Sequence, residues 1–326
     1  SLTSPSYVPA QKPRPLILVA CSGGPDSLAL AAATSWVANR LGVRAGAVVI
    51  DHQLQAGSAQ VATWAMGVCS RLGLAPVIVR TIKVNTSSGL GIEAAAREAR
   101  YEALAEQAEI WGAGSIMLGH TLEDQAETVL LRLGRGSGAR ALSAMASTNG
   151  RWHRPFLGVS RAVVRESAME VLDAIGERPW EDPHNANTAF ARVRVRNLLG
   201  QLSDALGPGF ALGLARSASM LKDDADALDR LSQDMFDALV TTKGLACSVS
   251  IEDLAGVDRA LRTRVIRQMC IRAGAPAAVL SREQVLTVDS LVTQWHGQGP
   301  AHLPRGVRAS RECGRLTLTG LSNHRG

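Results

Sequence analysis

The sequence lacks long apolar runs and paired cysteines. No stretch reaches the 18 or so consecutive apolar residues that a membrane-spanning helix needs, so none is expected. The first 15 residues, SLTSPSYVPAQKPRP, are polar and proline-rich without the apolar core of a signal peptide, so we expect a disordered lead-in. The five cysteines are scattered, odd in number and form no CxxC pair. These absences argue against a disulfide framework and against a zinc or iron–sulfur site, and they fit a reducing cytoplasm.

Lysine is also scarce, because only four of the 35 basic residues are lysines. The formal net charge is +6 and the pI is near 9.4. Arginine grips phosphate with two parallel hydrogen bonds, so a polyanionic partner such as RNA fits this composition. GC-rich coding, which favours arginine and alanine codons, explains the same count. The positions of the arginines therefore carry more information than their number.

The length of 326 residues and the hydrophobic content of 46% predict two domains with real cores. Strand-like and helix-like segments alternate through the first part of the chain. The expected strands are 16–20, 45–50, 75–82 and 115–120, and the expected helices are 27–42, 58–73, 91–112 and 121–134. This order predicts an α/β fold, a doubly wound parallel sheet with ligands at the carboxyl ends of its strands.

The pattern changes after residue 134, where a glycine-rich basic loop begins. The expected later elements are helices within 154–176, 178–202 (after a Pro/Asn loop), 211–240 and 259–274, and strands within 305–320. The acidic segment 211–240 predicts either a connector helix or an ordinary amphipathic helix with a solvated face. We expect one domain over 16–210 and a smaller, mostly helical domain over 211–326 that ends in short strands.

A polar turn, CSGGPDS, joins the first expected strand to the first expected helix. A helix N-terminus offers free N–H groups and the positive end of the helix dipole, which together hold anions. Gly23 and Gly24 allow the backbone to fold tightly and approach a ligand. Ser22 and Ser27 add hydroxyl donors. Asp26 would repel a phosphate unless a divalent metal lay between them, so the turn predicts a phosphate site with a metal at Asp26.

An ordinary strand-to-helix turn is the alternative, with Asp26 or Ser27 acting as the N-cap. Two known phosphate loops are excluded. No lysine follows the glycines, so the turn is not a Walker-type GxxxxGK loop, and GxGxxG is absent from it.

A second polar cluster follows the fourth expected strand. His120 ends that strand, and Asp124 and Glu127 lie three residues apart on the next helix, so they share one face. Capping is the alternative for Asp124, because Thr121-x-x-Asp124 is close to a capping box; it explains Glu127 less well. The CSGGPDS turn, an Asp-His pair after the second strand and a Gly-His pair after the fourth all fall at one edge of the expected sheet. A ligand site is predicted there.

Two groups of arginines have suggestive spacing. Arg97 and Arg100 share one face of the third expected helix, and Arg192, Arg194 and Arg196 alternate in FARVRVRN. The density of the second group suits a phosphate backbone. Either group alone would be interpreted as a solvated basic surface.

Together these segments resemble one family. The order CSGGPDS, IDHQL, IEAAAREARYEAL, GHTLEDQAETVLLRLGRGSG, RPFLGVSR and DPHNANTAFARVRVRNLL is similar to that of tRNA(Ile)-lysidine synthases, which are ATP pyrophosphatases with an SGGxDS loop. The similarity covers about residues 16–205, and the tail HLPRGVRASRECGRLTLT resembles the family's small C-terminal domain more weakly. The resemblance implies an adenine nucleotide alpha hydrolase-like catalytic domain followed by a tRNA-binding domain.

The resemblance also implies a reaction. ATP and Mg²⁺ are used to join free L-lysine to the wobble cytidine in the CAU anticodon of tRNA(Ile). The 2-carbonyl oxygen of the cytosine attacks the α-phosphate, pyrophosphate leaves, and the base becomes adenylated. The ε-amine of lysine then attacks the activated carbon and AMP departs. Such an enzyme is expected in the cytoplasm, away from membranes, as a monomer or a homodimer.

Site residues carry over by motif. The nucleotide would be bound by Ser22, Gly23, Gly24, Pro25, Asp26 and Ser27. Among these, Asp26 would hold Mg²⁺. His120, Asp124 and Glu127 match GHxxxDQxET, whose two acids are expected to hold the lysine ammonium or a second Mg²⁺. A carboxylate keeps an ammonium protonated whereas the nucleophile must be neutral, so an acid or His120 has to take the proton.

The arginines carry over as well. Arg100 would steady the reacting base or the phosphate. Arg192, Arg194 and Arg196 match an RxRxR stretch that binds tRNA and sends one member to the active site. After the Asp-His pair the family usually has Gly-Leu-Arg, whereas this chain has Gln53-Leu54-Gln55. Any contact made by that family arginine is not expected here.

Two other functions stay open. The first is another ATP pyrophosphatase, such as a tRNA thiolase or an amide-forming synthetase. Thiolases usually need paired or catalytic cysteines, and none occupy suitable positions. The second is a non-catalytic nucleotide- or RNA-binding module. It would tolerate loss of Asp26, Asp124 and Glu127, all of which are present.

Overall fold

The computed structural model describes residues 15–53, 55, 57–83, 92–181 and 187–320. The expected lead-in before residue 15, Leu54, and part of the Pro/Asn loop lie outside these residues. The chain divides into two compact units, residues 1–220 and 221–326. Across the described part of the chain, no helix combines the length and apolar character needed to cross a bilayer. All five cysteines are free thiols.

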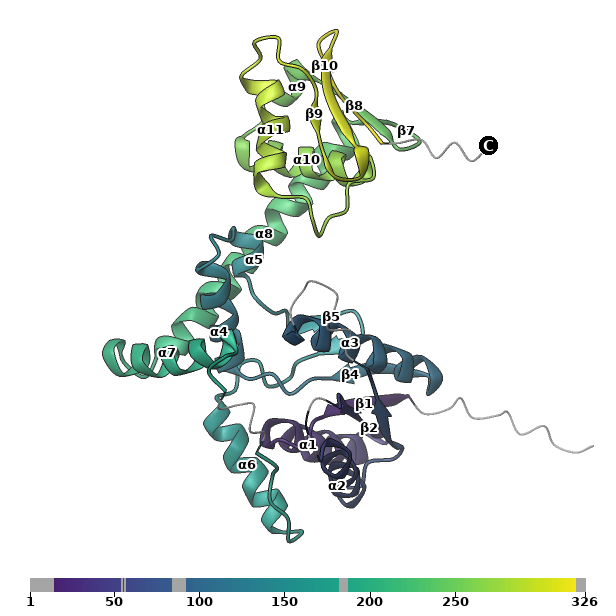
Figure 1. The fold of residues 1–326 in the computed structure, drawn as a ribbon, viewed down its shortest axis with the longest axis vertical. Helices are drawn as coiled ribbons and strands as arrows, with labels where there is room; N and C mark the ends of the chain where they lie inside the picture. The colour runs from purple at the N-terminus through teal and green to yellow at the C-terminus, as the bar shows by residue number, and fades with distance from the viewer. Residues whose placement is uncertain (1–14, 54, 56, 84–91, 182–186, 321–326) are drawn as a thin grey trace, which may run out of the picture. The chain divides into compact units, whose positions relative to one another are not determined.

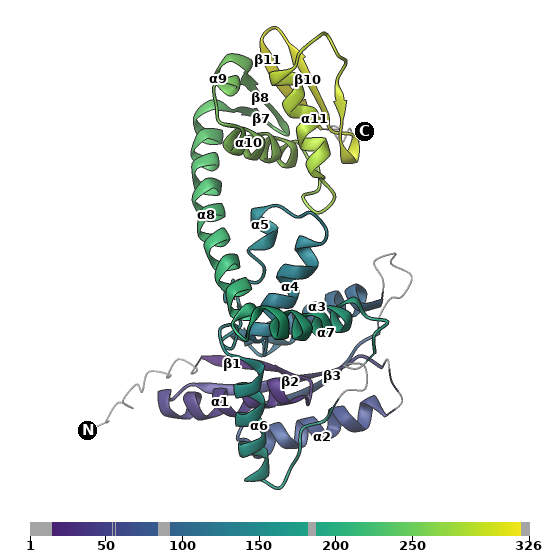
Figure 2. The ribbon, with the colours of Figure 1, turned by 90° about the vertical axis from the view of Figure 1, so that its left-hand side faces the viewer.

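A six-stranded sheet forms the centre of the first unit, in the order β3-β2-β1-β4-β6-β5 (Figures 1 and 2). The strands are β1 (Leu16–Cys21), β2 (Arg44–Asp51), β3 (Val77–Thr81), β4 (Ala113–Met117), β5 (Thr148–Asn149) and β6 (Trp152–His153). Neighbouring strands are parallel except β5 with β6. The four expected strands are confirmed, and the two-residue strands β5 and β6 were not expected.

Helices cover both faces of this sheet, which confirms the doubly wound α/β fold (Figure 1). Helices α1 (Pro25–Leu41) and α2 (Ser58–Arg71) lie on one face and α3 (Ile92–Ile110) lies on the other. The remaining helices of the unit are α4 (Leu122–Leu133), α5 (Ala139–Leu142), α6 (Arg161–Asp173) and α7 (Ala191–Leu206). Val19 of β1 packs with Leu30 of α1 and Val68 of α2. Its neighbour Leu18 packs with Leu104 of α3. Successive strand residues face opposite sides, so β1 anchors a core on each face.

The strand order reverses between β1 and β4. Strands β2 and β3 continue from one side of β1, and β4 and β6 continue from the other. Open α/β sheets bind ligands at this point, beyond the carboxyl ends of the strands. The CSGGPDS turn follows β1 and Gly119-His120 follows β4, so the fold brings both to the predicted position. Gly119 permits a close approach, because a Cβ there would lie 3.0 Å from the backbone oxygen of Asp26.

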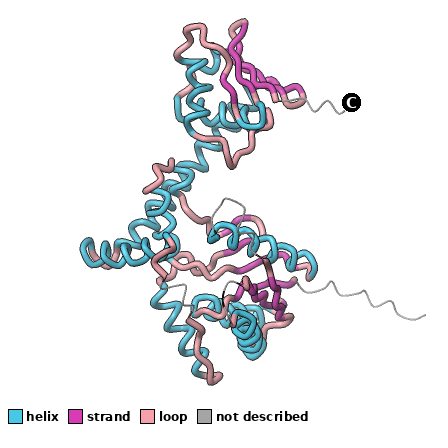
Figure 3. Tube along the Cα trace, in the orientation of Figure 1, coloured by secondary structure: helices cyan, strands magenta, loops and turns pink. Residues whose placement is uncertain are grey.

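The second unit contains a five-stranded antiparallel sheet in the order β7-β8-β11-β10-β9; strands of both units are magenta in Figure 3. From α8 onward the elements are α8 (Phe210–Leu239), β7 (Thr241–Lys243), β8 (Ala246–Ser250), α9 (Ile251–Ala255), α10 (Arg259–Arg272), α11 (Arg282–Thr293), β9 (Ala301–His302), η2 (Pro304–Gly306), β10 (Arg308–Glu312) and β11 (Arg315–Thr319). The helical part and the strands near the end are confirmed, whereas β7 and β8 were not expected.

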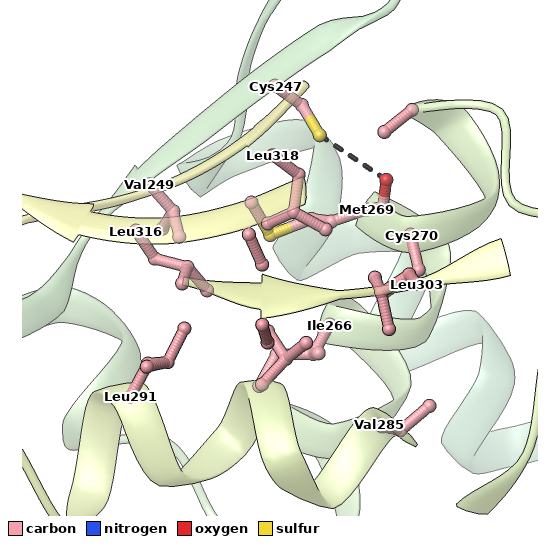
Figure 4. Packing of buried hydrophobic residues seen from close by; sticks show 14 of the residues in the cluster. Cys247, Val249, Ile266, Met269, Cys270, Val285, Leu291, Leu303, Leu316 and Leu318 are labelled. Atoms are coloured by element: carbon pink, nitrogen blue, oxygen red, sulfur yellow. Dashed lines mark hydrogen bonds between the residues drawn. The ribbon is translucent and has the colours of Figure 1, made fainter. Parts of the chain in front are cut away.

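Apolar side chains of this sheet pack against α10 and α11 (Figure 4). Val249 and Leu316 lie on neighbouring strands, and both join a core that contains Ile266 and Met269 of α10. The thiol of Cys247 donates to the Met269 carbonyl oxygen at 3.4 Å (Figure 4). This cysteine is therefore a packed core residue.

Candidate active site

The turn after β1 is organised around the hydroxyl of Ser27. That hydroxyl donates to the carbonyl oxygen of Gly24 at 2.9 Å and accepts from the backbone N–H of Ser22 at 3.1 Å. Helix α1 begins at Pro25, and its N-cap is Gly24 with no side-chain cap. The alternative in which Asp26 or Ser27 caps this helix is therefore wrong. The carboxylate of Asp26 is left available for another role.

The same turn is held from outside by a segment that follows α6. The backbone N–H of Trp180 donates to the Gly23 carbonyl oxygen at 3.1 Å. Gly23 has a φ of 82°, and a Cβ there would lie 3.1 Å from the Trp64 ring. Trp64 Nε1 in turn donates to Glu177 Oε2 at 2.8 Å. Gly23 is thus required both by its backbone conformation and by the nearby ring.

A cavity of about 380 Å³ lies beside the turn. It is lined by Ser22 and Gly24, by Gln53 and Gln55 after β2, and by Arg100 of α3. Its size falls within the range of small-molecule sites. The two glutamines that replace the family's usual Gly-Leu-Arg pattern therefore still face the cavity.

A second cavity, of about 190 Å³, shares His52, Ala96 and Arg100 with the first. Its lining also includes His120 and Arg192. Because the two cavities have common walls, a ligand in one lies next to a ligand in the other.

The second cavity is lined by several arginines, yet His120 in its wall is neutral. Burial lowers the pKa of His120 to about 3, and the charges of Arg100 and Arg154 act in the same direction against Asp124. His120 Nδ1 is buried and has no hydrogen-bond partner. Desolvation also lowers the pKa of Arg100, but a guanidinium keeps its charge in proteins. The permanent charge of this cavity therefore comes from arginine.

Three carboxylates meet around the guanidinium of Arg161, the first residue of α6. Its Nη2 donates to Asp124 Oδ1 at 2.8 Å and to Glu127 Oε1 at 3.3 Å. Its Nε lies 3.8 Å from Asp26 Oδ2. From α7, Arg196 Nε donates to Glu127 Oε1 at 2.8 Å. We call these five side chains the acid cluster.

The two carboxylate oxygens of Asp124 have different hydrogen-bond partners. Its Oδ2 accepts from the backbone N–H of Thr121 at 2.8 Å, so the capping alternative for Asp124 is confirmed. Its Oδ1 binds Arg161. Burial raises the pKa of Asp124, but Arg161 and the Thr121 N–H outweigh that effect and lower it. For Arg161 itself, burial lowers the pKa, and the surrounding carboxylates more than reverse this.

Asp26 behaves differently, because burial raises its pKa and Arg161 only partly opposes the change. Asp26 Oδ1 and Glu127 Oε2 are buried without a hydrogen-bond partner. Among the described residues, no three acidic, histidine or cysteine side chains converge as a metal site. Magnesium usually takes one or two protein carboxylates together with water and phosphate oxygens. A lone buried carboxylate oxygen beside the turn after β1 fits that preference.

Comparisons with known proteins agree with this geometry. A family model described as a PP-loop domain matches residues 4–202, and one described as the TilS substrate binding domain matches residues 250–317. The tRNA(Ile)-lysidine synthase of Thermobifida fusca is 49% identical over 305 residues, which cover 93% of this chain and 91% of that protein. The enzyme of the same name from Streptomyces coelicolor is 44% identical over 320 residues, with 97% and 88% covered.

The chain belongs to the tRNA(Ile)-lysidine synthase family.

The family resemblance inferred from the motifs is thereby confirmed, and the PP-loop domain implies the use of ATP. A solved structure, the U34-tRNA thiolase NcsA from Methanococcus maripaludis, aligns with a TM-score of 0.51 at 14% identity. The alignment covers 65% of this chain and 74% of that one. This likeness concerns the fold alone.

In this member of the lysidine synthase family the alternating arginines occupy three different places. Arg196 joins the acid cluster, and Arg192 lines the second cavity. Arg194 Nη1 donates to the carbonyl oxygens of Thr188 and Ala189, both at 2.8 Å. Arg194 therefore fastens the segment that leads into α7.

The sequence does not single out Arg161, although this residue ends the motif RPFLGVSR. It lies 37 residues from Asp124, so no local spacing connects the two. A weaker signal was present. Arg161 directly follows the N-cap Ser160, and a basic residue is unfavourable near a helix N-terminus. Such a placement indicates an acidic partner elsewhere in the lysidine synthase fold.

Proposed function

We propose that this chain joins free L-lysine to the wobble cytidine of tRNA(Ile) that carries a CAU anticodon. ATP activates the base as an adenylate, and the products are lysidine, AMP and pyrophosphate. The geometry that supports this function is the common wall between the cavity beside the PP-loop turn and the basic second cavity. Relatives named for this reaction match more than nine-tenths of the chain, at 93% and 97%.

The triphosphate would lie against the turn after β1. The N-terminal N–H groups of α1 and the Ser22 hydroxyl would bind it, while Gly23, Gly24 and Pro25 keep the backbone close. Ser27 shapes the turn, because its hydroxyl already binds two backbone groups. Asp26 would hold Mg²⁺ through Oδ1, and this ion would offset the charge of the departing pyrophosphate.

The cytosine would occupy the second cavity. Arg100 lines both cavities, so it can stabilise the negative charge that develops between base and α-phosphate. The lysine ammonium would bind the unpartnered Oε2 of Glu127. The lysine proton would pass to His120 or to a carboxylate of the acid cluster.

The second unit would bind the tRNA outside the anticodon. The TilS substrate binding domain, which matches residues 250–317, supports this assignment for the second unit. Arg192, on the wall of the second cavity, would contact the anticodon loop, and Arg196 would act in the acid cluster. A cytoplasmic location and a homodimer stay predictions.

Substitution of Asp26 tests the proposal. The protein is incubated with ATP, Mg²⁺, labelled lysine and tRNA with a CAU anticodon, and both pyrophosphate release and label in the RNA are followed. The expected result is tRNA-dependent pyrophosphate release with lysine incorporation, both abolished in Asp26→Ala. Asp204→Ala, at an exposed position of α7, is the matched control. Pyrophosphate release that does not depend on tRNA, or a preference for a sulfur donor over lysine, would contradict the proposal.

A further inference from the structure

Arg161 contacts the carboxylates of Asp26, Asp124 and Glu127, but the proposed function gives Arg161 itself no role. Its side chain is only 17% exposed. Its backbone N–H donates to Glu123 Oε2 at 2.8 Å, and the Leu122 N–H donates to the Val159 carbonyl oxygen at 3.0 Å. The start of α6 is thus fastened to the start of α4. The Arg161 guanidinium therefore keeps a fixed place beside Asp124 and its neighbours.

Some carboxylate oxygens of the acid cluster accept hydrogen bonds, and others have no donor. Both oxygens of Asp124 are occupied, one by Thr121 and one by Arg161. Glu127 Oε1 accepts from both Arg161 and Arg196, whereas its Oε2 is buried and has no partner. Glu127, rather than Asp124, therefore retains an acceptor atom for an incoming cation.

The charges of the acid cluster affect how it would bind an ammonium ion. Arg161 and Arg196 offset the charges of Asp124 and Glu127, while Asp26 is assigned to Mg²⁺ in the proposed function. Removing a guanidinium would leave an excess of negative charge, which would bind the ammonium more tightly and keep it protonated. The nucleophilic amine must lose that proton before it attacks. The two arginines therefore set how firmly the cluster holds its substrate.

We propose that Arg161 is a positioning residue that directs Glu127 Oε2 to the lysine ammonium and limits the negative charge around it. This inference rests on the proposed function. Arg161 occupies Asp124 Oδ1 and Glu127 Oε1, which would otherwise compete for the ammonium. Arg161 lines neither of the two cavities, so it would act through the carboxylates.

The test compares Arg161→Met with Arg161→Lys, using the full chain and tRNA with a CAU anticodon. Removing the charge in Arg161→Met should lower the KM for lysine about 10-fold, because a neighbouring charge shifts such an equilibrium by about one unit or more. The kcat for lysine transfer should fall at least about 10-fold, because the amine keeps its proton.

Arg161→Lys keeps the charge but loses the planar fork that joins two carboxylates. Its KM for lysine should stay within about 3-fold of the wild type, with a smaller fall in kcat. Arg165→Met is the matched control, because Arg165 lies one turn along α6, is 50% exposed and pairs with the exposed Glu181 at 3.1 Å. We expect no change in the lysine KM for this control.

Each outcome decides the inference. A raised lysine KM in Arg161→Met, or kinetics equal to those of Arg165→Met, overturns it while the proposed function stands. Absence of lysine incorporation by the wild-type protein overturns the proposed function and the inference together. If thermal melting shows that Arg161→Met does not fold, Arg161→Lys decides. A reduced kcat with a near-normal lysine KM then supports the inference, and an unchanged kcat overturns it.

Discussion

Replacing Gly119 by alanine perturbs the contact that brings the loop after β4 against the PP-loop turn. An added Cβ would lie 3.0 Å from the backbone oxygen of Asp26 and 3.2 Å from its carbonyl carbon. Comfortable contacts of this kind are about 3.5 Å or longer, so the two segments must separate by roughly 0.5 Å. Gly119 does not have a positive φ, so the penalty is steric and not conformational.

Two magnitudes follow for Gly119→Ala. Overpacking destabilises the folded state by about 1–3 kcal/mol. Alanine also reduces the conformational entropy of the unfolded chain, which stabilises the protein by about 0.4–1 kcal/mol. The free energy of unfolding should therefore fall by about 1–2 kcal/mol. A misplacement of about 1 Å can slow a reaction about 100-fold, so half that displacement of Asp26 should lower kcat for pyrophosphate release about 10-fold.

The matched control is Gly114→Ala within β4, where an added Cβ meets no atom within 4 Å. We expect Gly114→Ala to stay within about 0.5 kcal/mol of the wild type and to keep full activity. Urea denaturation and tRNA-dependent pyrophosphate release are measured for both variants. If Gly119→Ala is as stable and as active as Gly114→Ala, the argument from close approach is refuted.

Three other predictions concern charged and titratable groups. Arg196→Ala should lower kcat at least about 10-fold by leaving a buried carboxylate without its Nε partner, whereas Arg194→Ala should spare kcat; equal kinetic losses would contradict the division of roles. The folded-state pKa of His120 is depressed to about 3 from 6.5, so the unfolded state protonates first. The free energy of unfolding should fall by up to about 1.4 kcal/mol per pH unit below pH 6.5. Urea melts at several pH values should show that this free energy depends less steeply on pH for His120→Asn than for the wild type. Asp289→Asn should destabilise the second unit by about 3 kcal/mol in urea, because Arg262 Nε donates to that buried carboxylate at 2.7 Å; a loss below about 1 kcal/mol would contradict this.

Features that the sequence encodes locally could be predicted from it. The apolar run 16–20, the glycines that follow and the helix after them are contiguous, so the strand, the turn and the helix could be predicted in order. His120, Asp124 and Glu127 could be predicted to lie near one another because β4 and α4 adjoin in sequence. The short strands β5 and β6 carry too few residues for any periodicity to show. Strand β8 was missed because its five residues are a weak pattern by themselves.

The missing parts of the site depend on contacts between distant segments. Sequence spacing does not show that Arg192 lines the second cavity while Arg196 joins the acid cluster, because both positions depend on what α7 packs against. The alternative with Asp26 or Ser27 as the N-cap of α1 was wrong because Gly24 is the N-cap and the Ser27 hydroxyl binds Gly24 and Ser22, an arrangement that residue preference does not reveal. The neutral state of His120 comes from burial, and burial is a property of the folded chain.

Strand β11 is the middle strand of its sheet, between β8 and β10, although it is the last of the five to leave the ribosome. Until Arg315–Thr319 has been synthesised, the β7–β8 hairpin and β10 have no common neighbour. Nascent chains must therefore carry an unfinished apolar surface, the kind of surface that holdase chaperones bind. A premature stop codon just before Arg315 would remove the centre of this sheet rather than trim its edge.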